Sequence, residues 1–256
     1  MNDSRLPGFH KLDIAERIAA LRQRGCLSAE DAARLRDGRH VLSSVAADKI
    51  IENVVGVFGL PFAVAPNFRV NDRDYIVPLV VEEPSIVAAL SSAARLARNG
   101  GGFQAVCEES LLAGQVYVTG AVNAAAAMKA VQTEKQDLLE SANKVHPRLM
   151  ARGGGVRDLN VERLELPDGA PLIRVHVLID TVDAMGANLV NTVCEAIAPK
   201  IASLCEGDVA LRILSNLADR AVVTARVRFS TDDLGSSGLD GGAVRDAIVT
   251  ANNIAL

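Results

Sequence analysis

The chain has 256 residues, of which 49% are hydrophobic, and a formal net charge of −4. Such a chain can bury a sizeable core, so we expect a globular protein with one large domain or two modest ones. Aromatic residues make up only 3% and no basic cluster is present, which argues against nucleic acid as a partner. No apolar stretch reaches the roughly 20 residues that span a bilayer, so a soluble protein without a membrane partner is expected.

Cysteine and histidine spacing excludes the common metal and disulfide frameworks. The four cysteines have no C-x-x-C spacing, and they are Cys26, Cys107, Cys194 and Cys205. The four histidines have no paired spacing either, and they are His10, His40, His146 and His176. We therefore expect no metal site and a reducing, cytoplasmic setting.

The first hundred residues predict helices around one hairpin. Apolar positions at helical spacing predict two short helices between Asp13 and Arg36, with Ser28 as the N-cap of the second. Helical periodicity predicts a third helix over 45–58, ending before Pro61. Strand-like runs at 62–70 and 74–81 around Asn71-Asp72-Arg73 predict a hairpin, followed by an alanine-rich helix over 85–98 that ends at a glycine run.

After the glycine run the pattern changes to the order β-α-β-β-α-β. The predicted elements are a strand at 115–122, a helix at 124–143, strands at 157–166 and 172–179, a helix at 186–204 and a strand at 209–214. This order matches the split βαβ, ferredoxin-like unit. A further strand at 221–229 and a helix from Ala243 follow.

These elements predict the α+β class: a large α/β domain, incomplete in this chain, with an inserted ferredoxin-like (split βαβ) small domain. The simplest partition makes 1–109 the first segment of the large domain, 110–219 the small domain and 220–256 the start of the return segment. The last helix has no closing glycine before Leu256. We therefore expect exposed apolar surface on the large domain, which favours aggregation.

Two acidic segments are candidates for chemistry. Glu82-Glu83-Pro84-Ser85 lies where a strand ends and a helix begins, and only one of two adjacent carboxylates on an extended segment can face a pocket. Either one glutamate is a reactive acid or both are charges at a helix N-terminus. Glu52-Asn53 interrupts an apolar helical run, so this pair either faces a cleft or forms an exposed stripe.

Two glycine-containing segments are candidates for binding an anion. Asp183-Ala184-Met185-Gly186-Ala187-Asn188 follows a strand and opens a helix, where small residues and helix amides suit a pyrophosphate. An ordinary turn capped by Asp183 is the alternative. Gly153-Gly154-Gly155 is either a phosphate-approach loop or a flexible turn, and Ser215 to Asp219 either faces a cleft or forms a plain turn. No G-x-G-x-x-G fingerprint is present.

Taken together, these segments resemble class II hydroxymethylglutaryl-CoA reductases. The resemblance covers essentially the whole chain, and Glu-Glu-Pro-Ser together with Asp-Ala-Met-Gly-Ala-Asn is specific. The ordered set that carries it is Ser4-Arg5-Leu6-Pro7, Glu52-Asn53-Val54-Val55-Gly56, Val77-Pro78-Leu79-Val80-Val81-Glu82-Glu83-Pro84-Ser85-Ile86-Val87-Ala88-Ala89, Gly153-Gly154-Gly155, Asp183-Ala184-Met185-Gly186-Ala187-Asn188 and Arg212-Ile213-Leu214-Ser215-Asn216-Leu217-Ala218.

The resemblance implies an oxidoreductase that interconverts 3-hydroxy-3-methylglutaryl-CoA with mevalonate and CoA through two hydride transfers. It implies that Glu83 is catalytic and transfers a proton to the substrate carbonyl oxygen, a task that needs a buried carboxyl group. It also implies that Ser85 contacts the hydroxymethylglutaryl group and that Glu52 and Asn53 line or support that pocket. Homodimers or higher oligomers, with the active site shared between subunits, are expected.

The small domain of the family binds the dinucleotide, and the resemblance implies that Asp183, Met185, Gly186 and Asn188 do so here, with Asn216 near the cleft. NAD-preferring relatives carry an aspartate in the segment after the long helix of this domain. The matching segment here, 143–148, has no acid, and it offers His146 and Arg148 to a 2′-phosphate. The expected cofactor is NADP or NAD, with NADP favoured.

The family's catalytic set also includes a lysine in an Asn-Lys-Gly context, an aspartate and a histidine, all of which the resemblance places beyond Leu256. A lysine that stabilises an oxyanion supplies several kcal/mol, so we expect no useful turnover from this chain alone. The alternative is a non-catalytic remnant that only binds nucleotide or CoA, or only dimerises.

Overall fold

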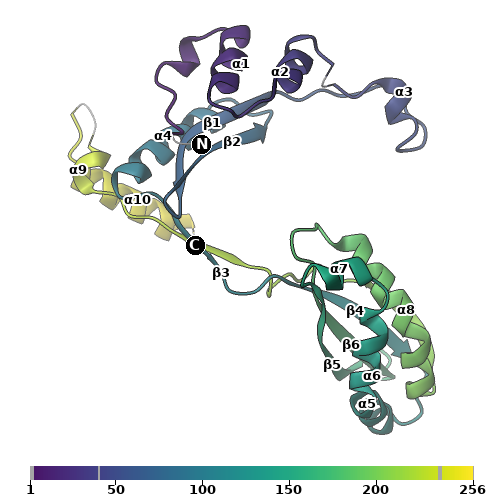
Figure 1. The fold of residues 1–256 in the computed structure, drawn as a ribbon. Helices are drawn as coiled ribbons and strands as arrows, with labels where there is room; N and C mark the ends of the chain where they lie inside the picture. The colour runs from purple at the N-terminus through teal and green to yellow at the C-terminus, as the bar shows by residue number, and fades with distance from the viewer. Residues whose placement is uncertain (1–2, 40, 236–237, 256) are drawn as a thin grey trace. The chain divides into compact units, whose positions relative to one another are not determined.

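The computed structural model describes residues 3–39, 41–235 and 238–255, so His40 and Leu256, which entered the sequence predictions, lie outside the described residues. The chain mixes helices and strands, which confirms the predicted α+β class. It divides into two compact units, labelled in Figure 1 by their elements. Unit 1 comprises Met1–Ala105 and Ala225–Leu256, and unit 2 comprises Val106–Thr224.

Unit 1 begins with four short helical elements. They are η1 (Phe9–Lys11), α1 (Ile14–Gln23), α2 (Ala29–Arg36) and α3 (Ser44–Ala47). Helix α1 starts with a capping box, in which Asp13 and Glu16 each accept the backbone N–H of the other. Ser28 caps α2 by accepting the N–H of Asp31, as predicted from its position before an apolar repeat.

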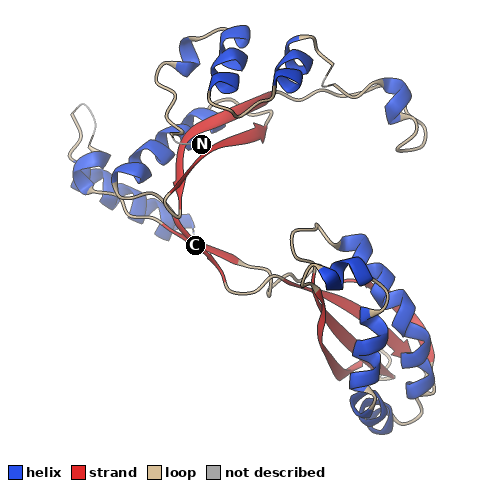
Figure 2. Ribbon diagram, in the orientation of Figure 1, coloured by secondary structure: helices blue, strands red, loops and turns tan. Residues whose placement is uncertain are grey.

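The helix predicted over 45–58 is wrong. Only α3 forms, and residues 48–61 are turn and loop, drawn in tan in Figure 2. The large apolar side chains of this segment stay exposed, including Ile50, Ile51, Val55 and Phe58. Because helices are stabilised mainly by burying an apolar face, helical spacing without a surface to pack on does not produce a helix here.

The predicted hairpin is confirmed. β1 (Phe62–Val70) pairs antiparallel with β2 (Arg73–Val80), with a bulge between Ala65 and Phe68. The connecting residues Asn71 and Asp72 both adopt positive φ angles, 47° and 61°, which asparagine and aspartate tolerate in tight hairpin turns. Helix α4 (Ile86–Asn99) follows and packs on β1 through its buried residues Ala94 and Ala97.

A buried polar network fixes the N-terminal segment to this hairpin. The N–H of Ser4 donates to Asp74 Oδ2 at 2.6 Å, and Ser4 Oγ donates to the carbonyl of Phe68 at 2.9 Å. Arg98 Nη2 on α4 donates to the same Asp74 oxygen at 2.7 Å. The Ser-Arg-Leu-Pro motif therefore begins with a structural residue.

Four further elements belong wholly or partly to unit 1. β8 (Val223–Arg226), shorter than the strand predicted over 221–229, pairs with β3 (Gln104–Cys107), which the sequence did not predict. Helices α9 (Thr231–Leu234) and α10 (Gly241–Ala255) follow, and α10 begins two residues before the predicted start.

Unit 2 contains a four-stranded sheet in the predicted split βαβ order. The strands are β4 (Leu111–Thr119), β5 (Gly155–Glu165), β6 (Pro171–Asp180) and β7 (Asp208–Leu214). Their order is β5-β6-β4-β7, and all three neighbouring pairs are antiparallel. β6 therefore lies between β4 and β5, which run parallel to each other.

Helices cover one face of this sheet (Figure 1). They are α5 (Ala124–Thr133), α6 (Lys135–Asn143) and the long α8 (Ala187–Cys205), with the short α7 (Pro147–Ala151) before β5. The single helix predicted over 124–143 is wrong, because it is interrupted at Glu134. The core between the two layers is aliphatic, and its fully buried members include Val116, Val175, Val177, Val190, Ile197 and Ile201.

Candidate functional site

The predicted catalytic segment lies between β2 and α4. Ser85 occupies the residue before α4 in a left-handed conformation, with φ 72° and ψ −18°, and its side chain caps nothing. Serine seldom adopts this conformation, and such residues concentrate at functional sites. Glu83 is exposed. The burial expected for its carboxyl group is therefore absent in the single chain, because no described element covers this bend.

Glu52 and Asn53 do not lie in a helix. They occupy a bend after α3, both are exposed, and Asn53 has φ 58°. Among the described residues no hydrogen bond joins either of them to Glu83 or Ser85. The single chain thus brings Glu83 and Ser85 together and leaves Glu52 and Asn53 on a separate segment.

Unit 1 contains a groove of about 1970 Å³, bounded by the N-terminal helices, the segment 57–69 and α4. Ser85 lines it, whereas Glu52, Asn53 and Glu83 do not. Part of the lining is apolar, including Leu6, Leu21, Leu35 and Phe62.

The ionisable residues that line this groove are all basic. They are the six arginines Arg5, Arg17, Arg36, Arg69, Arg95 and Arg98, with His10, and none of the described lining residues is acidic. Since the whole chain carries more acidic than basic residues, this lining is a local property of the groove. Guanidinium groups can bind phosphates, and the apolar lining can contact a less polar part of the same ligand.

In unit 2, a strained turn connects β6 to α8. Val182 has φ 57°, a rare conformation for a β-branched residue, and its N–H donates to Asp180 Oδ1 at 2.9 Å. Gly186, at the N-cap of α8, has φ 86°, and an added Cβ would lie 2.6 Å from Thr181 Cγ2. Glycine is therefore required at this position by packing inside unit 2.

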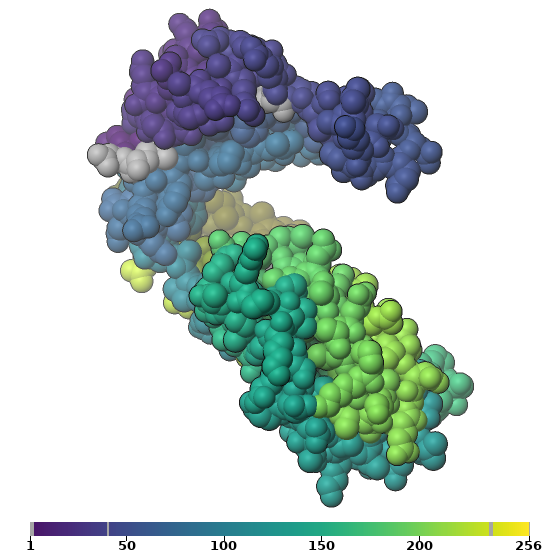
Figure 3. All heavy atoms as spheres, turned by 45° about the vertical axis from the view of Figure 1, so that its right-hand side comes forward, coloured from purple at the N-terminus to yellow at the C-terminus, as the bar shows by residue number. Residues whose placement is uncertain are grey.

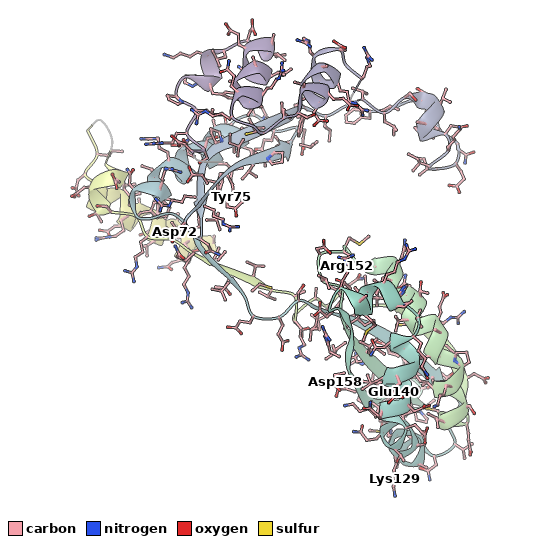
Figure 4. The ribbon with its side chains drawn as sticks, viewed as in Figure 1. Asp72, Tyr75, Lys129, Glu140, Arg152 and Asp158 are labelled. Carbon is pink, nitrogen blue, oxygen red and sulfur yellow. The ribbon has the colours of Figure 1, made fainter. Side chains whose placement is uncertain are left out.

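The other residues predicted for this turn face outward. Met185 is 79% exposed, and Asn188 is exposed in the first turn of α8. Gly186 holds the N-cap position of α8. The predicted alternative, an ordinary turn capped by Asp183, is therefore wrong. Instead, Asp183 forms an ion pair with Arg152, which is labelled in Figure 4 at the α7 end of unit 2.

The three glycines beside Arg152 differ in how closely their surroundings pack against them. A Cβ on Gly154 would lie 2.8 Å from the carbonyl oxygen of Asp180, and one on Gly155 would lie 2.6 Å from Asn143 Oδ1. Packing inside unit 2 therefore requires glycine at both positions. Gly153 has open space around it, so it is the member of the run that a ligand could approach.

Two arginines flank these loops. Arg157 Nη2 donates to Asp180 Oδ2 at 2.9 Å, and this hydrogen bond holds the pKa of Asp180 below its ordinary value. Arg148 is exposed, and among the described residues its side chain has no hydrogen-bond partner. His146 is half-buried, and its Nε2 lies 3.3 Å from the carbonyl oxygen of Leu189.

Asn216 lies in the exposed loop after β7. In this loop the N–H of Ser215 donates to the carbonyl of Ala113 at 2.7 Å, and the N–H of Leu217 donates to Ser215 Oγ at 3.1 Å. The first bond continues the antiparallel pairing of β7 with β4, whereas the second is typical of a turn. In the described parts of the chain, no group of three or more histidine, cysteine or acidic side chains could hold a metal ion. Nor does any described helix have the length and apolar character needed to cross a membrane.

The sequence did not reveal the basic groove. Its arginines come from positions between 5 and 98, and no local spacing links them. Arg152 and Arg157 could have been found from the sequence, because they flank the glycine run 153–155, which is a candidate for binding an anion.

Unit 1 thus has a groove lined by basic residues, and unit 2 has an exposed strand-to-helix turn. Residues 13–256 match the family model for hydroxymethylglutaryl-coenzyme A reductase. The chain belongs to the hydroxymethylglutaryl-coenzyme A reductase family, which confirms the resemblance found in the sequence.

Two curated relatives are similar to most of the chain. The 3-hydroxy-3-methylglutaryl-coenzyme A reductase of Archaeoglobus fulgidus is 43% identical over 233 residues, which cover 91% of this chain and 52% of that protein. The probable 3-hydroxy-3-methylglutaryl-coenzyme A reductase of Borreliella burgdorferi is 30% identical over 187 residues, covering 72% of this chain and 40% of that protein. The chain spans about half the length of the curated relatives it matches.

Solved structures of the Streptococcus pneumoniae reductase have the same fold. One is similar with a TM-score of 0.89 and 36% identity, covering 97% of this chain and 58% of that chain. A second, described as a class II reductase bound to NADPH in open conformations, has a TM-score of 0.88 and 37% identity, covering 97% of this chain and 66% of that chain.

Proposed function

We propose that this chain supplies the acyl-CoA-binding and dinucleotide-binding surfaces of a reductase that interconverts 3-hydroxy-3-methylglutaryl-CoA with mevalonate and CoA. The observation that carries the proposal is the groove of unit 1. It combines basic side chains, the absence of carboxylates among its described lining residues, and Ser85 at its wall. Coenzyme A has this chemistry, because its phosphates are anionic and its pantetheine arm is long and only moderately polar.

The proposed roles follow the two units. The large domain (1–109 and 220–256) would bind the substrate, with Ser85 holding the hydroxymethylglutaryl group and Glu83 transferring a proton to the carbonyl oxygen. The small domain (110–219) would bind the dinucleotide. Glu52 and Asn53 would complete the substrate pocket of a homodimer. Their segment, which projects from the rest of unit 1 in Figure 3, carries exposed apolar side chains of the kind that a second subunit covers.

The donor set of unit 2 fits a nicotinamide dinucleotide. The N-terminal turn of α8 presents backbone N–H groups, and Gly153 has open space where a side chain would stand. Arg152 adds a guanidinium that is paired with Asp183, and exposed Arg148 adds a positive charge. A bound cofactor would supply the hydride. Asp183, Met185, Gly186 and Asn188 would orient it, with Asn216 in support. Arg148 favours NADP over NAD, and the NADPH bound by the Streptococcus pneumoniae relative supports this preference.

Titration calorimetry on the 256-residue chain tests the proposal, with CoA and NADPH as separate ligands. We expect each to bind at one site and neither to displace the other. The same preparation is assayed for oxidation of NADPH by hydroxymethylglutaryl-CoA, which separates binding from turnover. Failure of the folded chain to bind CoA would refute the assignment of the groove, and failure to bind NADPH would refute that of unit 2.

A further inference from the structure

We infer that Arg157 is a positioning residue for the dinucleotide: paired with Asp180, it fixes the glycine run 153–155 to the turn that opens α8. The inference rests on the proposed function, because it takes this run and this turn as the surface on which the dinucleotide binds. It adds two residues that act through the binding segments and need no contact with the ligand themselves.

Arg157 is the extra residue of a β-bulge in β5. Val156 pairs with Ile179 of β6, and Asp158 pairs with Leu178. At this step β5 therefore uses two residues where β6 uses one, and Arg157 is the additional one. A bulge bends its strand and redirects a side chain, and bulges are common beside functional sites. The bulge thus sets the direction of the Arg157 side chain independently of the alternation along β5.

The Arg157 guanidinium joins the glycine run to the end of β6. Its Nη2 donates to the carbonyl oxygen of Gly153 and, at 2.9 Å, to Asp180 Oδ2. The other oxygen of the same carboxylate, Asp180 Oδ1, accepts the N–H of Val182 at 2.9 Å. The hydrogen bond from Arg157 and that from Val182 hold the pKa of Asp180 below its ordinary value, so this group is a carboxylate at neutral pH. One guanidinium and one carboxylate therefore link the run to the turn.

The run and the turn are also in direct contact. A Cβ on Gly154 would lie 2.8 Å from both the carbonyl oxygen of Asp180 and Cγ2 of Val182. Val182 is held at φ 57°, which is costly for a β-branched residue, and its hydrogen bond to Asp180 offsets part of that cost. Loss of the carboxylate should therefore release the turn, and with it the backbone N–H groups at the start of α8.

The neighbouring pair of Arg152 with Asp183 differs in its solvation. The side chain of Asp183 is 79% exposed, whereas that of Asp180 is 28% exposed. A ligand phosphate can replace Asp183 as the partner of Arg152 at little cost, because an exposed ion pair contributes little. Displacing Asp180 from Arg157 would disturb the carboxylate that also holds Val182. Arg152 is therefore available to a ligand, whereas Arg157 holds the binding segments together.

The test is the dissociation constant and the stoichiometry of NADPH, measured by titration calorimetry on the 256-residue chain and on its variants Arg157→Ala and Asp180→Asn. We expect each substitution to weaken NADPH by about threefold to thirtyfold, the range for residues that modulate a site without touching its ligand. The stoichiometry should stay at one site, because the core of unit 2 is untouched. A substitution that only unfolded unit 2 would lower the number of sites and leave the dissociation constant unchanged, which would contradict the inference.

Asp180→Asn separates positioning from direct contact, because it leaves the Arg157 guanidinium in place and removes its carboxylate. If Arg157 itself bound the phosphates, this variant would bind NADPH as tightly as the unmodified chain or more tightly. Positioning requires a loss. Arg157→Lys should restore part of the affinity lost in Arg157→Ala, because it keeps the charge with fewer donors. The double variant should lose little more than the weaker-binding single variant, since the two residues act as one pair.

The matched control is Arg163→Ala, on the same strand. Arg163 pairs with Glu165 at 2.9 Å at the other end of β5, and its substitution should leave the NADPH constant unchanged. Undiminished affinity in Arg157→Ala or in Asp180→Asn, or an equal loss in Arg163→Ala, would overturn the role of Arg157 alone. Failure of the unmodified chain to bind NADPH would remove the proposed function of unit 2 together with this inference.

Discussion

Ser4, Asp74 and Arg98 show how single residues fix the frame of the groove. Asp74 accepts hydrogen bonds from both Ser4 and Arg98, and its side chain is only 9% exposed. Arg98 is also a groove residue. The network therefore holds the N-terminal segment, the hairpin and α4 in the geometry that the groove needs.

Replacing Asp74 by alanine should destabilise the chain by about 2 kcal/mol, because it leaves the partly buried Arg98 with only the more distant carboxylate of Asp3, at 3.7 Å. Urea unfolding followed by circular dichroism measures the loss. Glu30→Ala, which removes the exposed ion pair with Arg34, is the control and should cost less than about 0.5 kcal/mol. Equal losses in the two variants would show that the network contributes no more than a surface pair.

The same carboxyl group should give the stability a pH dependence. Burial alone would raise the pKa of Asp74, but hydrogen bonds from Arg98 and Ser4 outweigh it and lower this pKa below its ordinary value. A lowered pKa contributes stability that is fully present above about pH 4 and lost as the pH falls through the folded-state pKa. The difference in unfolding free energy between the unmodified chain and Asp74→Ala should therefore shrink from about pH 4 downward. A constant difference down to pH 2 would contradict this.

The two left-handed glycines beside Arg152 provide a matched pair. Gly155→Ala should lose about 1–3 kcal/mol more stability than Gly153→Ala, because both carry backbone strain but only Gly155 would also force a Cβ against Asn143 and Met150. Urea unfolding of both variants measures the difference. Equal losses would mean that unit 2 repacks around the added methyl group.

Residue-level predictions succeeded where the interaction is local in sequence. Ser28 was predicted correctly as a cap because its partner, Asp31, lies three residues away. The groove arginines and the Asp74 network could not be predicted, because their members are joined only by the folded chain. The exposure of Glu83 was missed for the same reason, since burial depends on what packs over a loop.

At the level of elements, the hairpin and the strands of the four-stranded sheet were predicted from alternation and turn residues, whereas β3 was missed and helix boundaries depended on packing. The predicted hairpin and the β4–β7 sheet order agree with the structure. The helix over 45–58 failed because its apolar side chains have nothing to cover them. The break at Glu134 has no strong sequence signal, since neither glycine nor proline marks it. Helix α7 has Pro147 in its first turn, but its five residues are too few to show a helical period.

The segment between α6 and β5 should set the preference between cofactors. Arg148→Ala should weaken NADPH binding by about tenfold and leave NADH binding unchanged, because only NADPH carries the 2′-phosphate. Fluorescence titration of the 256-residue chain with each nucleotide measures this. Lys129→Ala, at the other end of unit 2 in Figure 4, is the control and should alter neither constant. Equal weakening of both nucleotides would assign Arg148 to the shared diphosphate instead.

At the scale of the whole molecule, the two units differ in how completely they bury their apolar residues. Unit 2 has a continuous aliphatic core between its sheet and helices. Unit 1 leaves a run of large apolar side chains exposed between residues 41 and 62. An exposed run of this kind is expected where another polypeptide packs, so the proposed homodimer and the tendency to aggregate have the same physical origin.

Ile51 and Val55 test which surface drives this association. They lie on the exposed segment at 61% and full exposure, and neither lines the groove. Replacing both by serine should leave the unfolding free energy of the single chain within about 0.5 kcal/mol, because no packing is lost. The same substitutions should lower self-association, measured by sedimentation velocity over a range of concentrations. Val122→Ser, at an equally exposed valine of unit 2, should leave self-association unchanged. A loss of stability without a change in association would mean that the segment packs within its own chain in solution.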